Sequence, residues 1–124
     1  MNNVYIMSAN RSAIGGFGGT LKNHCPVDLG TLVAKEAIVR SGFEANEVEH
    51  AVFGNVIHTE PRDMYVSRVI ALQAGMDKAS AALTVNRLCG SGLQAIVSAS
   101  QIPMLGDASV AIAGGVEVMS NGAH

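Results

Sequence analysis

The sequence has 124 residues, which suffices for one modest domain with a hydrophobic core but not for two domains of ordinary size. Apolar residues make up 48%, charged residues 15% and aromatic residues 4%, with no tryptophan, so the core must be built from aliphatic side chains and methionine. The formal net charge is -2 and the eight Lys and Arg residues are scattered, which argues against a binder of nucleic acid or of an anionic membrane surface.

The chain opens on a short apolar run, Val4–Ser8, which predicts a strand leading into the glycine-rich stretch 15–19. Pro26 favours the first turn of a helix, and Gly42 is expected to end it. Asp28 lies in the first turn of this helix, where a negative charge is favourable. The face expected to be buried consists of Leu29, Leu32, Val33 and Ala37.

A second apolar run, 51–57, predicts a buried strand that ends at His58. Asp63 can cap a helix that starts near Met64, and Gly75 is expected to end that helix. The inward positions of this second helix are expected to be Val66, Val69, Ile70 and Leu72.

The segment 82–85 predicts a brief extended element, and a third helix is expected from Gly90. No formal charge occurs from residue 88 to residue 106, but the stretch is too polar for the centre of a bilayer. Its apolar pattern, Leu93, Ile96, Val97 and Ile102, covers almost the whole helix surface, so a central, buried helix is expected. Pro103 predicts a kink or an early helix end.

The final apolar run, Ala108–Ala113, predicts a buried strand. The alternation of strands and helices therefore predicts an α/β fold, a mostly parallel sheet with helices on both faces. No helix or strand follows this last strand to cover it, which suggests an incomplete domain. The absence of a basic region followed by an apolar leader predicts a cytoplasmic protein, and Cys25 and Cys89 are expected to be reduced.

Cys89 is the strongest chemical candidate. It stands between a short extended run and the helix start Gly90-Ser91-Gly92, where the helix dipole makes a thiol more acidic and more nucleophilic. Free backbone N–H groups near Gly90 could support a developing oxyanion. The alternative is structural, because an unpaired cysteine in an apolar stretch is most often a small buried hydrophobe.

Other candidates have weaker support. Cys25 and His24 are neighbours on a loop, and such neighbours rarely face each other. The glycine cluster puts Leu21 where a dinucleotide fingerprint needs its third glycine, so nucleotide binding is not supported. His58 follows a predicted strand, but a loop histidine needs no special role. No spacing of His, Cys or carboxylates indicates a zinc site.

Four segments, in this order along the chain, resemble the thiolase family. They are Arg11–Gly19, Phe53–Val56, the segment 85–96 around Cys89, and Gly114–Ser120. The similarity extends from Val4 to Ser120, and the detail of 54–65 looks most like bacterial acetyl-CoA acetyltransferases and β-ketothiolases. Two departures concern packing: Val118 replaces a usual serine, and Pro103 interrupts the helix that follows the cysteine.

The resemblance implies that Cys89 attacks an acyl-CoA to give an acyl-cysteine, and that a second acetyl-CoA then condenses with this intermediate. It equally implies the reverse reaction, the thiolysis of a β-ketoacyl-CoA. Coenzyme A thioesters would be substrates, with no separate cofactor or metal, and family members suggest a homo-oligomer. The family's Gly-His-Pro, Cys-x-Gly and Asn-Glu-Ala-Phe motifs do not occur here. Residues 1–124 are therefore expected to be a partial amino-terminal domain, without the loop domain or carboxy-terminal half, and inactive alone.

Two alternatives remain. One is a catalytically dead module derived from a thiolase, which self-associates or binds a partner through the uncovered strand Ala108–Ala113. The other is a ketosynthase-like condensing enzyme of the same superfamily. The context Asn86–Gly92 around the cysteine favours a thiolase over a ketosynthase.

Overall fold

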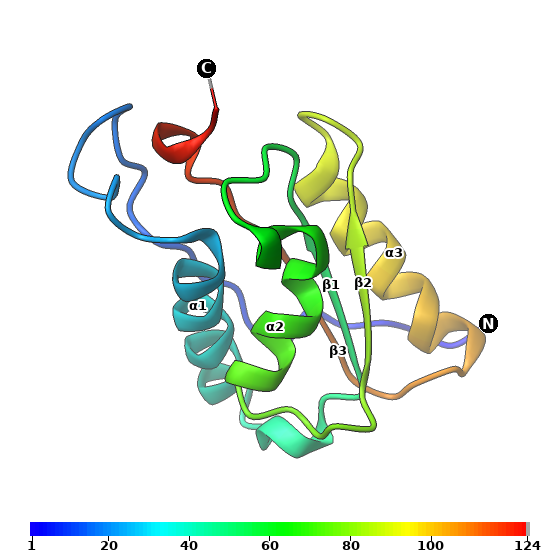
Figure 1. The fold of residues 1–124 in the computed structure, drawn as a ribbon. Helices are drawn as coiled ribbons and strands as arrows, with labels where there is room; N and C mark the ends of the chain where they lie inside the picture. The colour runs from blue at the N-terminus through cyan, green and yellow to red at the C-terminus, as the bar shows by residue number, and fades with distance from the viewer. Residues whose placement is uncertain (124) are drawn as a thin grey trace.

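The computed structural model describes residues 1–123 of the chain, so His124, the last residue of the predicted domain, lies outside the described residues. Its centre is a three-stranded sheet in the order β2-β1-β3, formed by β1 (His50–Gly54), β2 (Ala81–Val85) and β3 (Ala111–Gly115). Both strand pairs are parallel, and Gly54 at the end of β1 lies opposite Val85 and Gly115 (Figure 1). The predicted α/β fold with a parallel sheet is confirmed.

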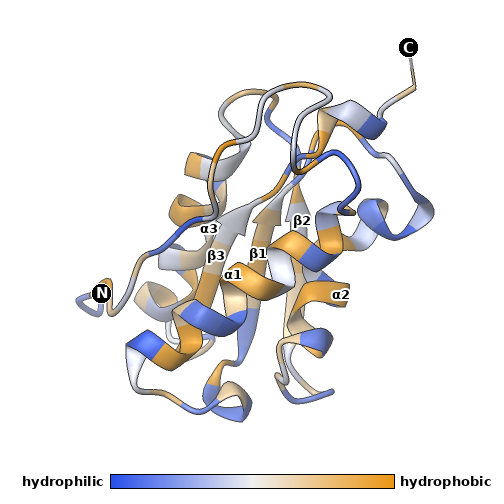
Figure 2. Cartoon of the chain, turned by 90° about the vertical axis from the view of Figure 1, so that its left-hand side faces the viewer, coloured by the Kyte–Doolittle hydropathy of each residue, from blue (hydrophilic) through white to orange (hydrophobic). Residues whose placement is uncertain are grey.

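Helices cover both faces of the sheet. Alternate residues of a strand point to opposite faces; Ala51 and Phe53 pack into the cluster formed with α1 (Pro26–Ser41) and α2 (Val66–Gln73). Val52 packs on the other face, against α3 (Ser91–Leu105). Figure 2 shows the hydrophobic strands between these two helical layers.

Helix α1 begins and ends where the sequence predicts. Pro26 is its first residue, and Gly42 follows its end in the left-handed conformation, with φ 80°. The predicted buried face is wrong in part, because Leu32 is exposed. Gly30 instead faces α2, so closely that a Cβ there would lie 2.4 Å from Ile70 Cδ1. The close approach of the two helices therefore selects the face that carries the small residue.

The segments that precede β1 and α2 differ from the prediction. A short 3-10 helix, η1 (Ala45–Glu47), precedes β1, and a second, η2 (Pro61–Tyr65), precedes α2. Asp63 lies inside η2 and accepts hydrogen bonds from the backbone N–H groups of Thr59 and Glu60, so it does not cap α2. Leu72, expected to point inward, is exposed on α2.

Helix α3 lies on the sheet but is not central in this chain. Ala95 and Ala99 are its buried apolar residues, whereas Leu93, Ile96 and Val97 are exposed. Small residues face the strands because they let the helix lie close to the sheet, so the larger side chains point away from it. The helix includes Pro103 and ends at Leu105, two residues later, with Gly106 left-handed. Within residues 1–123, no helix is long and apolar enough to cross a membrane.

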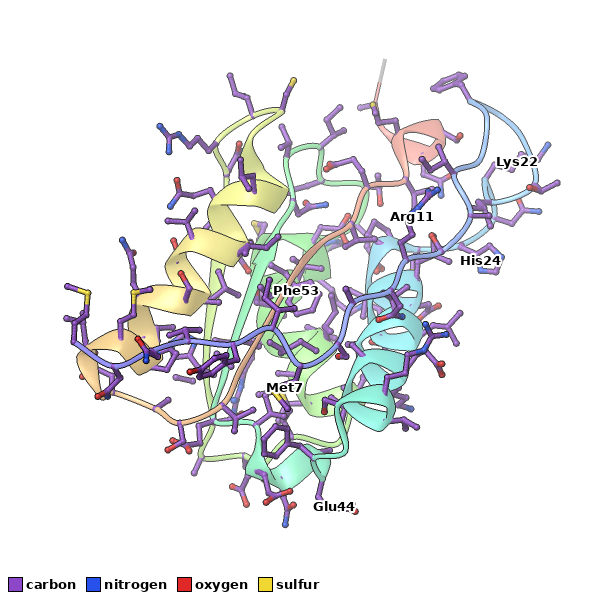
Figure 3. The ribbon with its side chains drawn as sticks, turned by 180° about the vertical axis from the view of Figure 1, so that it is seen from behind. Met7, Arg11, Lys22, His24, Glu44 and Phe53 are labelled. Atoms are coloured by element: carbon purple, nitrogen blue, oxygen red, sulfur yellow. The ribbon has the colours of Figure 1, made fainter. Side chains whose placement is uncertain are left out.

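The predicted strand Val4–Ser8 is wrong, because residues 1–16 have no regular secondary structure. The segment instead crosses the β3 side of the sheet from α3 to α1 (Figure 3). Asn2 donates to the carbonyls of Met104 and Pro103, and the Ser8 hydroxyl donates to Ala37 O at 2.7 Å. Its polar atoms are thus satisfied by helix ends and helix carbonyls, so it adds no strand to the sheet.

Candidate active site

The loops that follow the three strands gather at one edge of the sheet. Because all strands are parallel, their carboxyl ends lie together, which is where α/β folds commonly place ligand-binding residues. Figure 1 shows the turn before α3 on this edge, beside the loop that follows β1. Cys89 is in that turn, four residues after the end of β2 and two before the start of α3.

Cys89 is an exposed, free thiol. Gly90 is the residue that caps α3, so the cysteine stands directly outside the amino end of a 15-residue helix. This location matches the position that the sequence predicts, and within residues 1–123 the thiol is exposed. An exposed thiol at a helix amino end can meet both a substrate and the positive end of the helix dipole.

The backbone before Cys89 is strained. Leu88 has φ 50°, the one positive φ at a non-glycine residue in the described part of the chain. The buried Ser91 hydroxyl holds this conformation: it donates to Leu88 O and accepts from Arg87 N, both at 2.7 Å. The Ser91 N–H also donates to Leu88 O. Backbone strain of this kind collects at functional sites and persists where surrounding contacts enforce it.

The backbone amides near Cys89 differ in their partners. The Gly90 N–H donates to Arg87 O at 3.1 Å, so in this conformation it closes the turn. The amides of Cys89 and Gly92 have no partner within residues 1–123. Support of an oxyanion at Gly90 stays a prediction, and any such role requires that its turn hydrogen bond be shared or released.

Two glycines form the surface on which the start of α3 rests. A Cβ on Gly54 would lie 2.8 Å from Ser91 Cβ and 2.9 Å from Ser91 C, closer than real Cβ atoms approach. A Cβ on Gly115 would be 3.4 Å from Gly92 Cα. The ends of β1 and β3 are therefore in direct contact with the first turn of α3, and they set its height above the sheet.

The loops after β1 and β3 are joined by Glu117. Its Oε1 atom accepts hydrogen bonds from Ile57 N at 2.6 Å, Val56 N at 3.1 Å and Asn55 Nδ2 at 3.4 Å. The fully buried Asn55 side chain also donates to Val116 O at 2.9 Å. We call Glu117 and Asn55 the loop clamp. Neither residue was assigned a role from the sequence, although both lie in segments that carry the family resemblance.

The glycine-rich stretch 11–19 meets the other end of the chain. The Gly18 N–H donates at 2.9 Å to the hydroxyl of Ser120, which lies in the 3-10 helix η3 (Met119–Asn121). Figure 3 places Arg11 on the side of α1, away from the start of α3. The structure thus joins the first and last of the four resembling segments with each other, and the middle two with each other through the contact of Gly54 with Ser91.

The second thiol has a different environment. Cys25 is the residue before α1, it is half-buried, and Arg62 Nη2 lies 3.6 Å from its sulfur. Burial raises the pKa of the Cys25 thiol above its ordinary value, and a hydrogen bond with Asp28 adds to this. His24 is exposed, and the side-chain hydrogen bond at the Cys25 sulfur comes from Arg62 and not from this histidine. Nor do residues 1–123 bring three His, Cys, Asp or Glu side chains together as metal ligands.

Comparison with known proteins identifies relatives of the whole chain. Residues 4–124 match the family model described as thiolase, N-terminal domain. The chain is 58% identical over 117 residues to the beta-ketothiolase BktB of Cupriavidus necator, covering 94% of this chain and 30% of that protein.

Solved structures agree. The crystal structure of human mitochondrial 3-ketoacyl-CoA thiolase superposes with a TM-score of 0.91 at 36% identity, over 94% of this chain and 30% of that one. The acetyl-CoA acetyltransferase of Bacillus anthracis superposes with a TM-score of 0.89 at 42% identity, over 95% of this chain and 30% of that one. The chain therefore spans under a third of the length of these relatives.

Proposed function

Because the chain belongs to the thiolase family, we propose that it supplies the acyl-accepting nucleophile, Cys89, of a thiolase-type acyltransferase. The observation that carries the proposal is the position of Cys89: exposed, at the amino end of α3, on the edge of the sheet where the loops gather. We propose that residues 1–124 are the corresponding part of an amino-terminal thiolase domain.

The proposed chemistry is two thioester exchanges on one sulfur. The Cys89 thiolate attacks the carbonyl carbon of an acyl-CoA, the carbon–sulfur bond to coenzyme A breaks, and coenzyme A leaves as a thiol after taking a proton. A second acetyl-CoA loses a proton from its α-carbon and attacks the acyl-cysteine, which releases β-ketoacyl-CoA and returns the thiolate. The reverse sequence is thiolysis. A thiol suits both steps because it is a good nucleophile and a good leaving group.

The proposal assigns no proton-transfer groups within this chain. The resemblance places them in Gly-His-Pro, Cys-x-Gly and Asn-Glu-Ala-Phe motifs, and none of the three occurs in the 124 residues. The absence of an assigned base predicts that the isolated chain has no steady-state turnover, since loss of general acid–base groups costs several orders of magnitude. Acetoacetyl-CoA cleavage by the purified chain checks this, and a rate well above that of Cys89→Ala would contradict it.

A chimeric enzyme tests the proposed function itself. The residues of the Cupriavidus beta-ketothiolase that match this chain, 30% of its length, are replaced with the present sequence, and cleavage of acetoacetyl-CoA is measured. We expect activity within about tenfold of the parent, since the chains are 58% identical. Cys89→Ala should abolish it, and Cys25→Ser, the matched control at the other thiol, should not. A folded but inactive chimera, or one in which Cys89→Ala keeps its activity, would reject the proposal.

The substrates, assembly and location belong to the same proposal. The names of the relatives support acyl-CoA and acetyl-CoA as substrates, and one solved relative, the Acat5 thiolase of Ascaris suum, is in complex with coenzyme A. We also propose a homo-oligomer and a cytoplasmic location for the complete protein, as the sequence suggests, and no nucleic-acid or membrane partner.

One observation favours the second candidate function, a self-associating module without catalysis. The outer face of α3 carries Leu93, Ile96, Val97 and Leu105, all exposed, in a helix without formal charge. An exposed apolar face of this kind marks an interaction site. β3 is the edge strand that the sequence suggests for pairing, but residues 1–10 cross its side of the sheet. Sedimentation of the purified chain decides: a stable monomer with cooperative unfolding would exclude this candidate.

A further inference from the structure

We propose that Glu117 is a positioning residue for Cys89, which acts by holding the two strand ends on which the first turn of α3 rests. The inference rests on the proposed role of Cys89 as nucleophile. It follows from three connected contacts at the carboxyl edge of the sheet, none of which involves the sulfur itself.

The first contact is the carboxylate. Three donors converge on Glu117 Oε1: the backbone N–H groups of Val56 and Ile57 and the side-chain amide of Asn55. Its Oε2 atom also receives Val56 N, at 3.3 Å. Hydrogen bonds to an ionised carboxylate are stronger than neutral ones, and a carboxylate accepts several at once. An isosteric amide keeps one acceptor oxygen and turns the other into a donor, so it cannot reproduce this arrangement.

The second contact connects the end of β1 to the ends of both neighbouring strands, β2 and β3. The Asn55 N–H donates to Val85 O at 3.2 Å, at the end of β2, and Asn55 Nδ2 donates to Val116 O. Val116 N in turn donates to Gly54 O at 3.1 Å. The ends of all three strands are therefore connected through Asn55 and Val116, and Glu117 fixes the orientation of the Asn55 side chain.

The third contact is the seat of α3. Gly54 lies against Ser91, and Gly115 lies against Gly92, at distances that leave no room for a methyl group on Gly54. Ser91 is also the residue whose hydroxyl holds the strained turn before Cys89. A shift of the strand ends must therefore move the first turn of α3 or loosen the Leu88 conformation, and either change alters where the Cys89 sulfur stands relative to the helix end.

Alkylation of the two thiols in one chain measures this effect. The rates at which iodoacetamide modifies Cys89 and Cys25 are followed by peptide mass spectrometry near neutral pH, in the 124-residue protein and in Glu117→Gln. We expect the ratio of the Cys89 rate to the Cys25 rate to fall about threefold, as the thiol loses its fixed place at the positive end of α3. A general loss of structure would also lower this ratio, but by accelerating the half-buried Cys25 while the exposed Cys89 changes little. Only a fall caused by slower alkylation of Cys89, with the Cys25 rate unchanged, therefore counts as support.

Glu49→Gln is the matched control. The Glu49 carboxylate also holds a backbone amide, that of Ser109, at 3.2 and 3.3 Å, but it stands before β1, at the opposite end of the sheet. Its ratio should equal that of the original protein. The proposal is overturned if the ratio in Glu117→Gln is unchanged, or if Glu49→Gln lowers it as much. Should Glu117→Gln fail to fold, Glu117→Asp decides: a smaller fall of the ratio supports the proposal, and no fall overturns it.

The chimeric enzyme separates this inference from the proposed function. There, Glu117→Gln should lower kcat for acetoacetyl-CoA cleavage while KM stays unchanged, because the Glu117 carboxylate bonds to residues 55–57 and to no group of the turn that carries Cys89. If the unmodified chimera is inactive but the alkylation ratio falls in Glu117→Gln, the function is wrong and the positioning stands. If the chimera is active and Glu117→Gln changes neither kcat nor the ratio, the positioning is wrong and the function stands.

Discussion

The two faces of the sheet are packed in different ways. On the face of α1 and α2, the buried residues form a large cluster with bulky members such as Ile70, Val66 and Phe53. On the face of α3, the buried cluster consists of Val52, Ala95 and Ala99. On the first face, the large side chains remove much apolar area from water. On the second face, the small side chains bury less area but let the helix pack closer to the sheet.

This difference explains where the candidate nucleophile stands. Because small residues let α3 lie close to the sheet, its first turn contacts the ends of β1 and β3 directly, and the strained Leu88 and Cys89 come just before that turn. We infer that the α1 and α2 face stabilises the fold, and that the α3 face places the site.

The largest expected effect is in the larger cluster. Ile70→Ala removes a fully buried side chain between α1, α2 and the sheet, and it should lower the free energy of unfolding by about 3 kcal/mol. Leu93→Ala, on the exposed face of α3, should lower it by less than about 0.5 kcal/mol in the monomer. Urea unfolding of both variants checks this. Equal losses would show that the two faces do not differ as described.

Gly54→Ala tests the close packing of α3 against the end of β1. The added methyl group would collide with Ser91, including its backbone, so the helix or strand must shift, at a cost of about 2 kcal/mol. Gly92→Ala is the matched control, because a Cβ there meets nothing within 4 Å. Thermal unfolding should separate the two variants clearly. A Gly54→Ala protein as stable as Gly92→Ala would argue against a close seat for α3.

Ser91→Ala tests the turn that carries the cysteine. Loss of the buried hydroxyl leaves Arg87 N and Leu88 O each without one partner, which should cost about 1–2 kcal/mol. Unfolding experiments measure the loss, and hydrogen exchange of the Arg87 amide locates it. Unchanged protection of that amide would mean that the hydroxyl does not hold the turn.

The smallest effect concerns pH and the thiol at the start of α1. Since burial raises the folded-state pKa of Cys25 above its ordinary value, the stability linked to its protonated form is complete below that ordinary pKa. This stability is lost as the pH rises through the folded-state value. As the pH rises through this range, the temperature of thermal unfolding should therefore fall more steeply for the original protein than for Cys25→Ser. Parallel curves for the two proteins would contradict the assigned environment.

Local signals predicted most elements well. Pro26 and Gly42 mark the ends of α1 because each acts on the backbone next to it: the proline ring favours the first helical turn, and the left-handed glycine ends the last one. The runs around β1, β2 and β3 are visible because the strands of a parallel sheet are apolar. The expected burial holds for β1, but it is wrong for the last strand, since β3 and β2 are only half-buried or exposed in this chain. Periodicity alone failed for Leu32, Leu72 and the face of α3, since the choice of face depends on which neighbours lie close.

The expected first strand failed for a related reason. Residues 4–8 have the composition of a strand, but a strand exists only where a neighbour offers backbone hydrogen bonds in register. Here Ser8 bonds to α1, and Asn2 bonds to the end of α3. The position of Cys89 before a helix was foreseeable from Gly90-Ser91-Gly92; the loop clamp was not, because Asn55 and Glu117 are separated by 61 intervening residues and meet only in the folded sheet.

The sequence by itself determined the family and the parallel α/β fold, and it singled out Cys89 as the candidate that we propose accepts the acyl group, because motifs and apolar runs are local in the chain. The tertiary structure alone decided which helix faces are buried, how the turn at Leu88 is held, and which carboxylate joins the strand ends beneath Cys89. These depend on close contacts between distant segments, where a methyl group or a single hydrogen bond decides what fits.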